Sequence, residues 1–124
     1  MYQPKLEKDI RCPLEYGLHI FGGKWKSRII CVLAAKKQLR YKELRREMVN
    51  ITDAVLAAAL KELLADNIVK RQQYEEIPPR VEYCLTEKGA SIVPILQSIC
   101  RWSGTYHKEC SEYTPPQCKT CDYC

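Results

Sequence analysis

The alternation of apolar and polar positions between residues 41 and 67 predicts two helices joined by a tight turn. In the first helix, Tyr41, Leu44 and Met48 fall on one face at helical spacing. In the second, the same spacing recurs along four leucines: Leu56, Leu60, Leu63 and Leu64. Thr52 precedes the second helix and suits an N-cap, because its hydroxyl can accept a hydrogen bond from an unpaired N–H. The pair is a candidate helix-turn-helix, although a purely structural αα-hairpin shows the same pattern.

The residues that follow this helix pair favour two strands. Residues 68–74 form the first, and in residues 80–85 the side chains of Val81, Tyr83 and Leu85 share one face. The segment between them contains two prolines, which cannot continue a hydrogen-bonded ladder. A helix pair followed by such a hairpin is a winged helix, in which the hairpin lies beside the second helix and can touch DNA.

Further elements are expected on both sides of this unit. A helix with Pro13 in its first turn ends at Gly22-Gly23, and a second helix covers residues 24–36. Residues 38–40 suit a short extra strand that completes the sheet. The fold class expected is therefore α+β, mainly α: a winged helix-turn-helix with a two- to three-stranded wing sheet.

The last predicted helix follows Thr86, a second N-cap residue, and carries more apolar surface than one small domain easily covers. Its apolar positions are Ile92, Val93, Ile95, Leu96, Ile99, Cys100, Trp102 and Tyr106. We therefore expect part of this surface to meet a second subunit.

Length and composition bound this picture. With 124 residues, of which 46% are hydrophobic and 28% charged, the chain suits one domain with a short appendage. We place the winged-helix and dimerisation domain at residues 1–109 and a cysteine-rich tail at residues 110–124. No apolar run approaches the roughly 18 residues that a membrane span needs, and the charged N-terminus lacks an apolar signal core. A cytoplasmic location is expected by default.

Positive charge is concentrated around the helix pair. Of the chain's net charge of +5, residues 24–46 contribute +8, from nine Lys or Arg residues against Glu43, so the remainder sums to −3. Such a block commonly neutralises phosphates and releases their counterions, whereas the alternative is a solvated face that aids solubility. Its position at the helix pair favours phosphate contact.

Six blocks of sequence occur in a characteristic order along the chain: Cys12-Pro13-Leu14-Glu15, Gly22-Gly23-Lys24-Trp25, Tyr41-Lys42-Glu43-Leu44-Arg45, Leu56…Leu60-Lys61-Glu62-Leu63, Pro78-Pro79-Arg80-Val81-Glu82-Tyr83 and Leu85-Thr86-Glu87-Lys88-Gly89. Together they resemble the HxlR-type winged helix-turn-helix regulators, which are MarR-like. The resemblance implies a homodimeric transcriptional regulator whose N- and C-terminal helices form the dimer interface. It also implies binding to a pseudo-palindromic operator in double-stranded DNA, with half-sites about 34 Å apart or a multiple of this.

The same resemblance assigns residues to the DNA. Those expected at the major groove are Thr52, Asp53, Ala54, Ala57, Ala58 and Lys61; Arg71 and Arg80 belong to the wing; Tyr41 and Lys42 lie at the DNA backbone. The alanines and Asp53 depart from the long polar or basic side chains usual in the family. Since alanine can touch only a thymine methyl and aspartate repels phosphate, direct base readout is expected to be thin, with more weight on the wing and DNA shape.

Eight cysteines are many for a chain of this length. Cys31, Cys84 and Cys100 fall within regular elements and are expected to act as small core hydrophobes. Cys12 stands before a helix N-terminus, whose partial positive charge favours the thiolate. The resemblance implies one of two roles for Cys12: a sensor of an oxidant or small electrophilic effector through a disulfide across the dimer, or a plain helix-start residue.

The tail has a cysteine pattern that the resemblance does not cover. Cys110, Cys118, Cys121 and Cys124 have the spacing C-x7-C-x2-C-x2-C. Four thiolates could complete a tetrahedral zinc site, and the C-x2-C-x2-C part is also found in iron–sulfur ligation. Redox use of the thiols and an incidental tail remain alternatives to metal binding.

Two other functions compete with DNA-binding regulation. A winged helix that has lost DNA readout would be a protein-interaction module, and a thiol- or metal-handling protein would act through the tail. An enzyme is not expected, because His19 and His107 lack a nucleophile and an orienting partner in the sequence. Gly22-Gly23-Lys24 also lacks the upstream glycine of a phosphate-binding loop.

Overall fold

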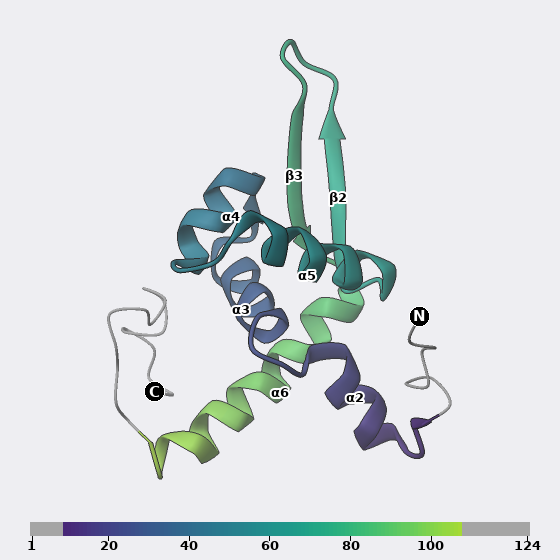
Figure 1. Ribbon diagram of the computed structural model, residues 1–124, viewed down its shortest axis with the longest axis vertical. Coiled ribbons are helices and arrows are strands. Elements are labelled where there is room, and N and C mark those ends of the chain that lie inside the picture. Colours follow the sequence, from purple (N-terminus) through teal and green to yellow (C-terminus); the bar gives the residue numbers. More distant parts are fainter. Residues whose placement is uncertain (1–8, 108–124) are drawn as a thin grey trace.

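The computed structural model describes residues 9–107, which form five helices and three strands (Figure 1). In chain order these are α2 (Pro13–Phe21), α3 (Lys26–Lys36), β1 (Gln38–Leu39), α4 (Tyr41–Met48), α5 (Asp53–Ala65), β2 (Val69–Tyr74), β3 (Arg80–Leu85) and α6 (Glu87–Gly104). The three strands form one antiparallel sheet in the order β1-β3-β2. This order and the α4–α5 pair confirm the winged helix-turn-helix expected from the sequence.

The elements divide between two ends of the molecule (Figure 1). The helix pair α4–α5 and the long β2–β3 hairpin occupy one end, and the hairpin extends beyond α5 as the wing. Helices α2 and α6 diverge at the other end, and α3 lies between the two groups. The register of the hairpin places Arg71 opposite Tyr83 and Tyr74 opposite Arg80.

The core is built around α3, whose residues Ile29, Ile30 and Val32 are completely shielded from solvent. Around it pack the apolar faces that the sequence predicts for the helix pair. The buried members are Leu44 and Met48 of α4, and Leu56, Leu60 and Leu63 of α5. Each such side chain contributes about 1.5–3 kcal/mol by leaving water. This burial fixes which side of α5 remains outward.

The ends of the elements follow the predicted local chemistry. The Thr52 hydroxyl accepts a hydrogen bond of 3.2 Å from the N–H of Val55 and so caps α5. The Thr86 hydroxyl accepts one of 3.0 Å from Gly89 and caps α6. Asn67 has φ 59°, the left-handed conformation expected after α5. These contacts set where α5 begins and where the wing follows it.

One predicted boundary differs in the structure. Helix α3 begins at Lys26 and not at residue 24, with Trp25 at its N-cap position and Gly23 turning the chain with φ 85°. In α2, Leu14 is 70% and Leu18 52% exposed, whereas Ile20 is buried. Among residues 9–107, no helix is both long enough and apolar enough to cross a membrane.

Candidate DNA-binding surface

The turn between α4 and α5 forms a basic hollow of about 620 Å³. It is lined by Lys42, Arg45, Arg46, Val49, Asn50, Ile51, Thr52 and Asp53. Three cations face one carboxylate, and all four of these side chains belong to exposed residues. Val49 turns the backbone here with φ 59°, which lets α5 begin close to α4. An excess of positive charge in an open concave surface suits a phosphate of a nucleic-acid backbone.

Asp53 at the first position of α5 is held by α4. Its Oδ1 lies 3.3 Å from Nε of Arg45 and accepts a hydrogen bond of 3.3 Å from the Tyr41 hydroxyl. The same hydroxyl lies 3.2 Å from the Asp53 carbonyl oxygen. Burial, followed by the negative charge of Asp53, raises the pKa of Tyr41 above its usual 10.0. Asp53 therefore joins the two helices, and its carboxylate is already engaged by groups of the same chain.

The outward side of α5 is formed mainly by small side chains. Ala54, Ala57 and Ala58 are exposed and lie away from the buried leucines, and Lys61 follows them toward the end of the helix. The Thr52 hydroxyl is occupied as a cap. This surface can approach another molecule closely, and Lys61 is its long cationic side chain.

The two wing arginines have different surroundings. Arg71 on β2 is exposed, as is the neighbouring Lys70. Arg80 on β3 is engaged within the wing: its Nη2 lies 3.2 Å from Oε2 of Glu76 and its Nε 3.9 Å from Oε2 of Glu82. Its guanidinium also lies 4.2 Å from the centroid of the Tyr74 ring. Arg71 is thus the more available cation for a phosphate.

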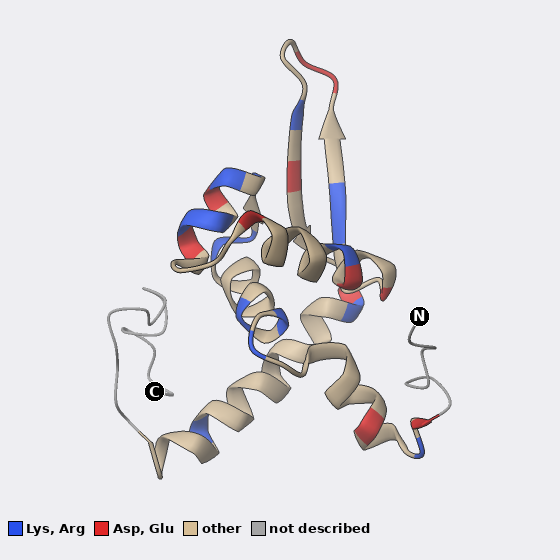
Figure 2. Cartoon of the chain, viewed as in Figure 1, with Lys and Arg blue, Asp and Glu red and all other residues tan. Residues whose placement is uncertain are grey.

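Charge along the hairpin changes from base to tip (Figure 2). The blue segment of β2 lies on the part of the hairpin nearer α5, whereas the tip carries Glu75 and Glu76 and a fully exposed Ile77. An acidic tip is repelled by phosphates, so the basic part of the wing near α5 is the part suited to a nucleic acid.

A second surface, on α2 and α6, is apolar and exposed. Its members are Leu14, Tyr16 and Leu18 on α2, and Ile95, Ile99, Trp102 and Tyr106 at or beyond α6. The rings of Trp102 and Tyr106 lie 5.4 Å apart, centroid to centroid. A surface of this kind commonly belongs to a contact with another protein or subunit.

The cysteines of the described residues differ in their exposure to solvent. Cys12 is exposed and stands as the N-cap of α2, as expected, while Cys84 is buried in the sheet. Cys31 and Cys100 are half-buried. Within residues 9–107 no cluster of His, Cys, Asp or Glu could hold a metal ion. The zinc site predicted for Cys110, Cys118, Cys121 and Cys124 lies outside the described residues.

Sequence reasoning missed part of this surface. The predicted site contained Tyr41 and Lys42 but not Arg45, Arg46 or Asn50, although these line the same hollow. The charge block from residue 24 to residue 46 did include both arginines, so the signal was present. Which members of that block meet at the turn depends on how α4 packs against α5, and charge alone does not specify this.

Comparison with known proteins supplies the family. Residues 20–111 match the family described as "HxlR-like helix-turn-helix". An uncharacterised HTH-type transcriptional regulator of Halalkalibacterium halodurans is 45% identical over 101 residues, which cover 82% of this chain and 89% of that protein. The redox regulator HypR in its oxidised form has a similar structure, with a TM-score of 0.71, 38% identity and coverage of 80% of this chain and 100% of HypR. The transcriptional regulator YodB of Bacillus subtilis, in its reduced form, has a TM-score of 0.72 and is 33% identical, and the match covers 82% of this chain and 100% of YodB.

Proposed function

The chain belongs to the HxlR-like helix-turn-helix family of transcriptional regulators, and on this premise we propose that it acts as a homodimer on a pseudo-palindromic DNA operator. The basic hollow at the α4–α5 turn is the observation that carries this proposal. Lys42, Arg45 and Arg46 there contact the DNA backbone, which positions the outward side of α5 in the major groove. Arg71 on the wing contacts a neighbouring phosphate.

The exposed apolar surface on α2 and α6 is the interface between the two subunits. It lies toward the end of the molecule opposite the wing, so a two-fold contact there leaves both helix pairs free (Figure 1). The two copies of α5 then meet successive major grooves, with half-sites about 34 Å apart or a multiple of this distance.

Sequence preference comes from few direct base contacts. Ala54, Ala57 and Ala58 reach no hydrogen-bonding group on a base, and the Asp53 carboxylate is engaged by Arg45 and Tyr41. Lys61 is the recognition-helix side chain long enough to reach a base edge, preferably guanine. Local groove width and deformability supply the rest of the preference.

Titrating labelled operator at several salt concentrations tests this proposal. Binding is expected to weaken steeply with salt, since each neutralised phosphate contributes about −0.9 to the logarithmic slope. A Lys61→Ala and Arg71→Ala double variant should lose specific operator binding. Salt-independent binding, or unchanged affinity of the double variant, would favour a protein-interaction module instead.

The proposed dimer is tested by a separate measurement of the oligomeric state. Ile99→Glu places a charge in the exposed apolar surface of α6 and should give a monomer by light scattering, with strongly reduced operator affinity. Lys36→Glu, at an exposed position on α3, is the matched control and should remain dimeric. A natural chain that is monomeric at micromolar concentration would contradict the two-fold arrangement.

We also propose a thiol-responsive role for Cys12. This residue is exposed at the start of α2, one of the two helices of the proposed interface, and a structural neighbour is a redox regulator. Oxidation with diamide should produce a disulfide-linked dimer on a non-reducing gel and change operator affinity, and Cys12→Ser should abolish both effects. An unchanged response of Cys12→Ser would assign the effect to other cysteines and remove this role.

A further inference from the structure

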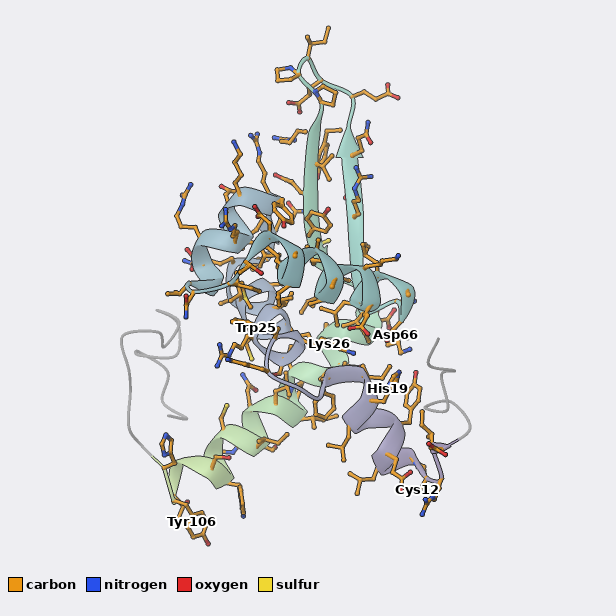
Figure 3. The ribbon with its side chains drawn as sticks, viewed as in Figure 1. Cys12, His19, Trp25, Lys26, Asp66 and Tyr106 are labelled. Atoms are coloured by element: carbon orange, nitrogen blue, oxygen red, sulfur yellow. The ribbon has the colours of Figure 1, made fainter. Side chains whose placement is uncertain are left out.

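We propose that Lys24 and Arg28 bind phosphates on the DNA strand opposite to the one met by the α4–α5 turn, so that α5 is held on both flanks. Both cations belong to the positive block of residues 24–46, and neither lines the hollow at the α4–α5 turn. Figure 3 shows Trp25, which lies between them in the sequence, between α5 and the region where α2 and α6 meet. This inference rests on the proposed function, because it adds a second set of contacts to the same DNA surface.

Helix α5 has charged partners on two opposite sides. Asp53 at its start meets α4, with Oδ1 3.3 Å from Nε of Arg45. Glu62 meets α3, with Oε2 3.7 Å from Nζ of Lys26. Asp53 and Glu62 are nine positions apart, which is about two and a half turns at 3.6 residues per turn, so they lie on opposite sides of the helix. The outward alanines of α5 are therefore flanked by α4 on one side and by the start of α3 on the other.

Each flank of α5 has an open hollow beside it. On the α4 side this is the basic hollow of about 620 Å³ at the helix turn. On the α3 side, a second hollow of about 390 Å³ is lined by the Gly22–Lys26 turn and by small side chains of α5 that include Ala54 and Ala58. These two alanines also belong to the outward side of α5, so the hollow at Trp25 borders the surface proposed for the major groove.

The side chains of Lys24 and Arg28 both lie against the ring of Trp25. Nζ of Lys24 is 5.1 Å and Cζ of Arg28 is 4.9 Å from the ring centroid. Within residues 9–107 neither forms an ion pair with a carboxylate, whereas Lys26 is engaged by Glu62. An aromatic ring holds a cation without cancelling its charge, and a stacked guanidinium keeps N–H groups that can donate to a phosphate. Lys24 and Arg28 are thus positioned cations with charge available to DNA.

The width of a major groove explains why both flanks matter. The groove is about 12 Å wide and has one phosphate strand along each edge. An α-helix with its side chains is about 10–12 Å across, so a helix in the groove brings both flanks close to a strand. Phosphate contacts fix the position and orientation of a protein on the duplex. Because the alanines of α5 give it few base contacts, cations on both flanks are needed to fix its depth and direction.

The salt dependence of DNA binding by the full chain tests these contacts. Lys24→Ala should weaken binding to operator and to unrelated duplex alike and reduce the logarithmic salt slope by about one unit, because it removes one phosphate contact. The Lys24→Ala and Arg28→Ala double variant should reduce the slope by about two units. Lys24→Arg keeps the charge and should retain the slope of the natural chain, which separates loss of charge from loss of structure.

Arg11→Ala is the matched control. Arg11 is an exposed cation next to Cys12, which lies at the far end of α2 from Trp25 (Figure 3). Its removal lowers the net charge as Lys24→Ala does, yet it should leave the salt slope unchanged. Circular dichroism and thermal unfolding of every variant verify that the fold is retained.

Ethylation interference assigns the contacts to the two strands. Ethylating a phosphate removes its charge, so binding becomes insensitive to ethylation wherever a variant has already lost that contact. The phosphates that become insensitive in Lys24→Ala should lie across the major groove from those that become insensitive in Lys42→Ala. This strand difference reports the placement of Lys24, which a general loss of positive charge would not produce.

The outcomes distinguish this inference from the proposed function. Unchanged salt slopes in folded Lys24→Ala and in the double variant, with operator still bound by the natural chain, would overturn the contacts and leave the proposed function standing. Insensitive phosphates on the same strand for Lys24→Ala and Lys42→Ala would overturn the placement on opposite flanks. A natural chain that binds no duplex DNA at low salt would overturn the proposed function and this inference together.

Discussion

Lys88 of α6 donates a hydrogen bond of 3.0 Å to the hydroxyl of Tyr16 on α2, across 72 positions of sequence. The same ammonium donates to the carbonyl oxygen of Asp66 at the end of α5, also at 3.0 Å. It further lies 5.6 Å from the centroid of the Tyr16 ring. One side chain therefore connects a helix of the proposed dimer interface to the end of the recognition helix.

Replacing Lys88 with alanine should destabilise the fold by about 1 kcal/mol. Charged hydrogen bonds contribute more than this when buried, but the site is exposed and solvent competes for the ammonium. Urea denaturation measures the change, with Lys61→Ala as the matched control because Lys61 is an exposed lysine of α5. Equal denaturation midpoints for the natural chain and both variants would show that Lys88 does not secure α2.

Gly89→Ala should destabilise the protein by about 2 kcal/mol or more. A Cβ at this buried position of α6 would overlap the carbonyl oxygen of Ile68, and backbone cannot move aside as a flexible side chain can. Gly17→Ala in α2 is the control, since its Cβ would meet only the Phe21 ring at an ordinary 3.6 Å. Thermal unfolding compares the two variants with the natural chain, and Gly17→Ala should be neutral or slightly stabilising. A stable Gly89→Ala variant would be inconsistent with the close packing of α6 on Ile68.

The pair Tyr41 and Asp53 predicts a pH dependence at the helix pair. Because the folded-state pKa of Tyr41 is raised, the protonated phenol favours the fold. This contribution is complete below the ordinary tyrosine pKa and is lost as the pH rises through the higher folded value. Asp53→Asn should lower the pKa of Tyr41 by removing the negative charge beside the phenol, although the part due to burial remains.

Ultraviolet difference titration of each protein against its Tyr41→Phe counterpart isolates this phenol from the other tyrosines. The natural chain should show a component titrating above pH 10.0, and Asp53→Asn should move that component to lower pH. An identical titration curve in the presence and absence of the Asp53 carboxylate would exclude the contact between α4 and α5.

The wing arginines should differ in their effect on DNA. Arg71→Ala should lower operator affinity several-fold and reduce the logarithmic salt slope by about one unit. The reason is that the substitution removes an exposed cation, and with it one contact to a phosphate. Arg80→Ala should change the slope less, since Glu76 and Glu82 already neutralise its guanidinium. Filter binding at several salt concentrations compares the two variants. A larger slope change for Arg80→Ala would reverse the assignment.

The sequence predicted the elements well where local chemistry determines them. Thr52 and Thr86 cap their helices and Asn67 takes a left-handed conformation, as the residue types indicate. The leucine spacing of α5 also gave the buried side correctly. These features depend on neighbours within a few residues, so a pattern in the chain is sufficient to find them.

The sequence pattern did not predict which side chains contact one another between different elements. The resemblance assigns Asp53 to the major groove, and the structure adds that its carboxylate meets Arg45 and Tyr41 across the helix turn. The resemblance assigns Arg80 to the wing, and the structure adds that Arg80 is paired along the hairpin. The hollow at Trp25 depends on the angle between a turn and a helix more than twenty residues away. Such contacts arise from packing directions, which composition and periodicity do not encode.

The strand order β1-β3-β2 leaves one side of β2 without a partner strand among the described residues. Its unpaired N–H and C=O groups could template a strand of another molecule and start aggregation. Lys70 and Arg71 lie on this border, and their like charges keep a second hairpin from pairing with it. The cations suited to phosphates thus also protect the protein from self-adhesion, and the wing must remain charged even when no operator is bound.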